Sequence, residues 1–191
     1  MKAYYDSRAQ EYDDWWLARG LYAPSPAGWE EERERLFEVV RRLPPKRTLD
    51  VACGTGLVTR LLRGEVVGLD QSPRMLARAS EHVDVVHGDG LELPFADGAF
   101  ERVFTSHFYG HLEEEERLRF LSEARRIAPE LVVVDAALHG GEERAEWQER
   151  RLKNGTRWSV YKRFFTVAGL LAELGGGEIL HEGRWFVVVA A

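Results

Sequence analysis

Short apolar runs alternate with segments of helical periodicity through the middle of the chain, and this alternation constrains the fold more than any other feature. Three of the runs, at 48–52, 66–70 and 131–135, are almost continuously apolar, as expected of strands buried on both faces of a parallel sheet. Two further runs lie at 83–87 and 100–105, and the segments with helical spacing are 57–63, 73–80 and 113–127. This order predicts an α/β fold with a doubly wound, mostly parallel sheet.

The N-terminal 45 residues are predicted to be helical and to precede the sheet. A first helix is expected over 3–18, and Pro24 and Pro26 separate it from a second. The second begins near Trp29, has apolar residues at helical spacing, and ends before Pro44 and its neighbour.

The C-terminal third has a different pattern. Residues 142–153 are interpreted as an amphipathic helix, and 166–174 as another helix with Thr166 as its N-cap. Two short apolar runs at 179–181 and 185–190 flank a glycine-containing turn. They predict a C-terminal antiparallel hairpin at the end of the sheet.

Composition limits the class of protein. The chain has 191 residues, which predicts a single domain over 1–191. With a net charge of −6, the chain lacks the basic surface of a general nucleic-acid binder, so no nucleic-acid partner is expected. The single cysteine, Cys53, excludes a zinc site with several thiolates, and no metal site is predicted. Without a long apolar run or a signal-like N-terminus, the chain is expected to be cytoplasmic and to have no membrane partner.

A loop of small residues follows the first apolar run. Ala52, Gly54 and Gly56 allow backbone to approach a ligand closely, and the helix expected after them would offer unpaired N–H groups. A dinucleotide fingerprint would need a third glycine where this chain has Thr59. Asp50 precedes the loop, and its carboxylate would repel a pyrophosphate but attract an ammonium group. The pocket is therefore interpreted as one for a cationic ligand without phosphates.

Acidic residues end three successive predicted strands. Asp70 lies twenty residues after Asp50 and can accept both hydroxyls of a ribose. Asp89 ends the third strand and can accept a hydrogen bond from an adenine amino group. Each acid could instead cap the following helix. The set of three, together with the glycine loop, favours a ligand crevice at the carboxyl ends of the strands.

In these segments the chain resembles the class I S-adenosylmethionine-dependent methyltransferases of the small-molecule type. The resemblance spans about residues 1–135 and rests on 50–56, 66–76, 88–95, 100–104 and His111. It implies a seven-stranded, Rossmann-like sheet, S-adenosyl-L-methionine as the cofactor and a small-molecule acceptor. The family often has glycine where this chain has Ala52.

The resemblance also implies which residues bind the cofactor. Asp50 and the backbone of Gly54 to Gly56 would hold its methionine part, and Asp70 its ribose. Asp89 and Leu91 would hold the adenine region. The full set of expected cofactor-binding residues is Tyr12, Asp50, Ala52, Gly54, Gly56, Asp70, Gln71, Met75, Asp89, Gly90, Leu91 and Ser106.

Two segments are candidates for the acceptor side. Residues 1–45 would form a helical cap, with Tyr12 as its best-placed contact, although its aromatic residues could equally be core. Residues 139–165 would form an acceptor-side insertion with Trp158, Tyr161 and Arg163 as substrate-binding residues. The basic side chains there suggest an anionic acceptor, and a solvated face with core tryptophans is the alternative.

His107, Tyr109 and His139 are candidate general bases, each with a structural role as the alternative. A base is needed only where the acceptor must lose a proton before an in-line displacement. Two other functions remain open at this point. One is a non-catalytic relative that binds S-adenosylmethionine or S-adenosylhomocysteine. The other is a nicotinamide oxidoreductase, against which Thr59 and Asp50 argue. The sequence predicts no oligomeric state.

Overall fold

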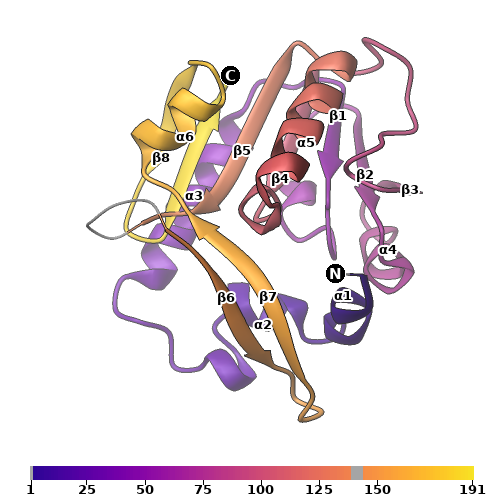
Figure 1. Cartoon of the computed structure of the whole chain (residues 1–191). Helices are drawn as coiled ribbons and strands as arrows, with labels where there is room; N and C mark the ends of the chain where they lie inside the picture. Colours follow the sequence, from indigo (N-terminus) through magenta and orange to yellow (C-terminus); the bar gives the residue numbers. More distant parts are fainter. Residues whose placement is uncertain (1, 139–143) are drawn as a thin grey trace.

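The computed structural model describes residues 2–138 and 144–191. Its centre is a seven-stranded sheet with the strand order β3-β2-β1-β4-β5-β9-β8 (Figure 1). The first five strands in the chain run parallel, whereas β9 is antiparallel to β5 and to β8. The predicted α/β fold, with its mostly parallel sheet and C-terminal antiparallel hairpin, is confirmed. The strands are β1 Thr48–Val51, β2 Val66–Asp70, β3 Asp84–His87, β4 Arg102–Ser106, β5 Glu130–Ala136, β8 Glu178–Glu182 and β9 Phe186–Ala190.

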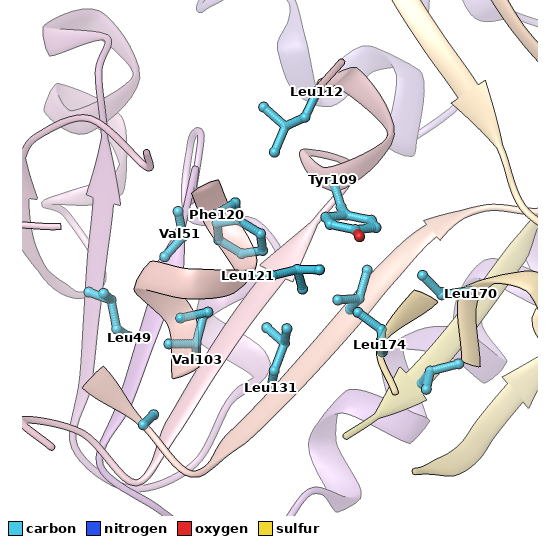
Figure 2. Close-up of a cluster of buried hydrophobic side chains, with 14 of the residues drawn as sticks. Leu49, Val51, Val103, Tyr109, Leu112, Phe120, Leu121, Leu131, Leu170 and Leu174 are labelled. Atoms are coloured by element: carbon cyan, nitrogen blue, oxygen red, sulfur yellow. The ribbon is translucent and has the colours of Figure 1, made fainter. Parts of the chain in front are cut away.

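Helices cover both faces of the sheet because the central strands are apolar on both faces. In β5, Leu131 and Val133 join one core cluster, and Val132 and Val134 join the other, as the two-residue period of a strand requires. The first cluster packs against α5 Glu114–Ile127 and α6 Val167–Glu173, and Figure 2 shows part of it. The second packs against α3 Trp29–Arg42. The remaining helix of the sheet layer, α4 Pro73–Ala79, has Ser72 as its N-cap.

The cap at the N-terminus contains two short helices where one was predicted over 3–18. They are α1 Lys2–Arg8 and α2 Tyr12–Trp16, followed by the 3₁₀ turn η1 Gly20–Tyr22. Tyr4 of α1 packs with Leu152 and Val160, whereas Trp16 of α2 packs in the cluster beneath α3. The chain breaks between the helices because these side chains bury against different parts of the molecule.

Two helix predictions are wrong. Residues 57–63 form only the 3₁₀ turn η2 Thr59–Leu61, because the segment is short and its Thr59 side chain turns inward to bond Asp50. No regular helix therefore opens behind the glycine loop.

The segment predicted as a helix over 142–153 is instead the strand β6 Arg144–Arg151. It pairs antiparallel with β7 Arg157–Phe164 in a separate two-stranded sheet, which Figure 1 shows beside α1 and α2. Asn154-Gly155 lies in the turn, with Gly155 at φ +84°. An Asn-Gly pair is a strong hairpin signal, and it outweighs the helical spacing of the charged residues before it.

Candidate functional site

A cavity opens at the carboxyl ends of β1, β2 and β4. We call it the glycine-loop cavity; its volume is about 190 Å³. The structure brings most of the expected cofactor residues to its wall, but not Asp50, Gly56 or Met75. Its lining residues are Tyr5, Tyr12, Ala52, Gly54, Leu69, Asp70, Gln71, Asp89, Gly90, Leu91, Ser106, His107, Phe108, His111, Leu112 and Glu116.

The loop between β1 and η2 depends on left-handed backbone. Ala52, Gly54 and Gly56 have φ of +61°, +58° and +78°. Alanine is strained in this region, whereas glycine is not. A side chain at Gly54 would meet the Tyr12 ring, and one at Gly56 would meet the backbone of Ala79. Gly54 therefore leaves room at the cavity wall, whereas Gly56 permits the loop to pack on α4.

Asp70 lies between the glycine loop and α4 and is 7% exposed. Its carboxylate accepts the Gly54 N–H at 2.9 Å and the Ser72 N–H at 2.8 Å. These bonds hold it at the cavity wall, while its burial raises its pKa. Met75 lies fully buried in the core below, with its N–H bonded to the Ser72 hydroxyl.

Asp89 is exposed at the rim of the cavity. Its carboxylate accepts the Leu91 N–H at 2.9 Å, which closes a turn over Gly90. Gly90 itself has no space for a side chain, since a Cβ there would lie 2.9 Å from Phe108 and from Val51. The turn holds the Leu91 backbone at the cavity wall.

Asp50 lies behind the glycine-loop cavity, on the wall of a smaller space that it shares with Tyr12, Ala52 and Ser106. It is 2% exposed, and its Oδ2 accepts the Thr59 hydroxyl at 2.6 Å. Its Oδ1 and the Ser106 Oγ are buried without a hydrogen-bond partner among the described residues. Burial raises the pKa of Asp50 to about 7, the negative charge of Asp70 adds to the rise, and the Thr59 bond opposes it. Two orphaned polar atoms beside the glycine loop fit a polar ligand.

Replacing Asp50 with asparagine is expected to flatten the pH dependence of stability. The folded pKa of about 7 lies above the reference value of 3.8. Between about pH 4 and pH 7 the folded state therefore keeps this carboxyl protonated, whereas the unfolded state has lost the proton. The free energy of unfolding of the parent therefore falls as pH rises from about 4 to 7, by up to about 4 kcal/mol from this carboxyl. Urea unfolding of both proteins at pH 5 and pH 8 measures the difference. Because the other carboxyls are common to both proteins, equal pH dependence would contradict the assigned burial cost.

A second cavity, of about 310 Å³, lies between the cap and the β6–β7 hairpin, and we call it the cap–hairpin cavity. It shares Tyr5, Tyr12, His107 and His111 with the glycine-loop cavity. Its other lining residues are Arg8, Trp15, Ala136, Gln148, Arg150, Lys162 and Phe164.

The predicted acceptor residues line neither cavity. Trp158 packs against Tyr4, Tyr161 packs against Trp147, and Arg163 forms an ion pair with Glu173 at 3.0 Å. The hairpin residues that line the cap–hairpin cavity are every second residue along each strand, for example Gln148 and Arg150. Reading 144–164 as strands, from the Asn-Gly turn, would have identified that alternation.

His107 is the predicted base that lies on the walls of both cavities. Its φ is +56°, its Nδ1 lies 3.7 Å from Asp135 Oδ1, and its Nε2 has no partner among the described residues. Burial, and then the charge of Lys162, lower its pKa to about 3, so the imidazole is neutral near pH 7. His111 has a similarly lowered pKa of about 3, chiefly through burial, and its Nδ1 lies 2.6 Å from the Tyr161 carbonyl oxygen.

The other two predicted bases lie elsewhere. Tyr109 is fully buried in the core of Figure 2, donates its hydroxyl to Glu173 at 2.8 Å, and lines neither cavity. His139 lies outside the described residues. Within 2–138 and 144–191, no group of His, Cys, Asp and Glu residues is arranged to hold a metal ion.

Comparison with known proteins finds methyltransferases among the similar sequences and structures. Residues 49–130 match the family model described as a methyltransferase domain. A demethylmenaquinone methyltransferase from Thermotoga maritima is 34% identical over 131 residues, which cover 64% of this chain and 54% of that protein. The corresponding protein of Thermus thermophilus is 35% identical over 97 residues, or 44% of each chain. The chain thus spans about half the length of the curated relatives it matches.

Solved structures are similar over nearly the whole chain. A complex of DhpI with S-adenosylhomocysteine has a TM-score of 0.74 and 25% identity, and covers 98% of this chain and 92% of that one. The complex titled DhpI-SAM-HEP has a TM-score of 0.72 and 26% identity, and covers 98% and 94%. The family match over 49–130, the similarity to the DhpI complexes and the sheet order found here together support a class I S-adenosylmethionine-dependent methyltransferase.

Proposed function

We propose that the protein transfers the methyl group of S-adenosylmethionine to a small-molecule acceptor by in-line displacement. The cofactor would bind in the glycine-loop cavity and the acceptor in the cap–hairpin cavity. One observation carries this assignment: the two cavities share Tyr5, Tyr12, His107 and His111. Two ligands in them would therefore meet at those side chains.

The proposed division of the chain follows from the same cavities. Residues 1–191 form one methyltransferase domain, in which 1–45 are the cap and 139–165 the acceptor-side insertion. Hydrogen bonds join the cap to the cofactor side. Asp6 accepts one from the Ser72 hydroxyl at 2.6 Å, and Asp13 accepts one from the Arg78 guanidinium at 2.7 Å. Lys153 of the hairpin turn forms an ion pair with Asp14 of the cap. Cap and hairpin together can exclude water from the reacting groups.

The proposed cofactor roles rest on the site geometry and on the DhpI complexes. Asp70 would accept the ribose hydroxyls, and the Asp89–Leu91 turn would border the adenine. Asp50, with its orphaned Oδ1, would face the cofactor's ammonium group. When bound, the cofactor supplies a methyl group already activated by its sulfonium, so the protein's main task is to position the reactants.

The proposed mechanism needs no strong base. A neutral His107 can orient an acceptor at the junction of the cavities, but a pKa of about 3 makes its imidazole a weak proton acceptor. The proposed acceptor would therefore react through an atom that already has a free lone pair near pH 7.

We expect the purified protein to bind S-adenosylhomocysteine and not NAD. Ligand at a hundredfold excess over its dissociation constant should raise the free energy of unfolding by about 2.7 kcal/mol. Titration calorimetry measures the affinity for each ligand, and thermal unfolding with and without ligand measures the stabilisation. Tight NAD binding, with no binding of S-adenosylmethionine or S-adenosylhomocysteine, would overturn the proposal.

A methyl-transfer assay separates an enzyme from a non-catalytic binding relative. The protein would be incubated with S-adenosylmethionine and a panel of acceptors that includes demethylmenaquinone, the substrate in the names of its curated relatives. Mass spectrometry should detect S-adenosylhomocysteine and an acceptor heavier by one methylene unit. Cofactor binding without turnover on any carboxylate, phosphate or quinone acceptor would favour the binding relative.

A further inference from the structure

The cap–hairpin cavity has an unbalanced charge. Its wall contains three cationic side chains, Arg8, Arg150 and Lys162. Among the described residues that line it, none is Asp or Glu. Lys162 is neutralised by a buried ion pair with Asp135, which lies behind the wall. The next question is which groups pair with the charges of Arg8 and Arg150.

Arg8 is 6% exposed, yet no carboxylate of the described residues lies within ion-pair distance of its guanidinium. Its Nη1 donates to the Tyr4 hydroxyl at 2.8 Å and its Nη2 to the Tyr22 hydroxyl at 3.3 Å. Its Nε is buried without a hydrogen-bond partner in that part of the chain. Burial raises the pKa of Tyr4, so that phenol is neutral. The rings of Tyr4, Tyr12 and Tyr22 lie 5.0–5.9 Å from the guanidinium carbon and make cation–π contacts, but they supply no anion.

Arg150 faces the same cavity from β6. The hydrogen bond found for its guanidinium goes to the neutral side-chain oxygen of Gln148. Burial lowers the pKa of His107 most; after it, the charges of Lys162 and Asp135 oppose each other, and those of Arg150 and Arg8 lower the pKa further. The two arginines therefore add a positive potential at the junction of the two cavities.

A buried arginine without an anion is costly in free energy unless a ligand supplies the anion. Guanidinium groups bind carboxylates and phosphates through paired N–H donors. The cavity's volume of about 310 Å³ lies at the lower end for small-molecule sites. We propose that the methyl acceptor is a small molecule with a carboxylate or phosphate-type oxyanion, bound by Arg8 and Arg150 in the cap–hairpin cavity. This inference rests on the proposed function, because it names the acceptor class of the same site.

The test uses calorimetry with inorganic phosphate and with acetate as probes. Each is titrated into the whole protein, with and without saturating S-adenosylhomocysteine. The parent should bind at least one of the two, and the preferred probe distinguishes a phosphate-type from a carboxylate acceptor. Because Arg8 is buried and its loss can unfold the cap, the decisive variant is Arg150→Gln, which should weaken anion binding at least tenfold.

The matched control is Arg157→Gln on the neighbouring strand. Arg157 is 63% exposed, forms an ion pair with Glu149 at 2.6 Å, and lines neither cavity. Its loss removes the same charge from the same hairpin and should change anion affinity less than twofold. Arg8→Lys, which keeps the charge but not the paired donors, should fall between the parent and Arg150→Gln.

Two results would overturn the inference. One is a parent protein that binds neither anion. The other is anion affinity reduced equally by Arg150→Gln and Arg157→Gln, because a general charge effect would then explain it. If S-adenosylhomocysteine does not bind the parent, the proposed function is overturned. The titrations without S-adenosylhomocysteine then still show whether Arg8 and Arg150 bind an anion.

Discussion

Asp70→Asn is expected to weaken S-adenosylhomocysteine binding by about 100-fold or more. In the proposed complex the carboxylate accepts two ribose hydroxyls, and a hydrogen bond to a charged group contributes about 1.5–3 kcal/mol. Losing two such bonds corresponds to at least two factors of ten in affinity. The Gly54 and Ser72 N–H groups bond different carboxylate oxygens, so asparagine keeps one of these bonds and loses the other. The lost bond should lower the free energy of unfolding by about 1–3 kcal/mol, which is measured separately from the loss of binding.

Calorimetry and urea unfolding of the same preparations compare the two effects. Asp84→Asn is the control, since that carboxylate is exposed at the start of β3 and lines neither of the two cavities. If Asp70→Asn binds the ligand as tightly as the parent, Asp70 serves only to join the glycine loop to the N-terminus of α4.

Lys162→Met is expected to lower the free energy of unfolding by about 3–5 kcal/mol. Asp135 is 0% exposed and Lys162 is 4% exposed, and the two side chains form an ion pair at 2.5 Å. Burial alone would raise the pKa of Asp135, but the charge of Lys162 holds it below its usual value. Methionine would leave that carboxylate buried without its counterion, which is far more costly than losing a surface pair.

Urea unfolding near pH 7 measures this loss, with Arg157→Gln as a surface-pair control expected to cost about 0–1 kcal/mol. The double variant Lys162→Met with Asp135→Asn should recover more than half of the loss, because it removes the unpaired charge. A single-variant loss as small as the control's would show that the ion pair does not join β5 to β7 energetically.

The sequence by itself determined the central sheet. Parallel strands covered by helices on both faces need continuous apolar runs, and this requirement is visible at 48–52, 66–70 and 131–135. Local capping signals also sufficed: Thr166 caps α6 through the Gly169 N–H, and α3 ends before the prolines that follow it. The position of Asp70 at the end of its strand was enough to place it at the cavity wall, because carboxyl ends of neighbouring parallel strands meet at one edge.

Only the tertiary structure decided how the acceptor side is built. Residues 144–151 satisfy helical spacing, but pairing along the whole length of β7 makes them a strand. Tyr109 could be a base from its place in the chain, yet packing puts it in the core. Arg8 and Arg150 are far apart in sequence, and no local pattern relates them. They meet because the cap and the hairpin fold over the same end of the sheet, and such long-range contacts depend on the whole fold rather than on periodicity or capping.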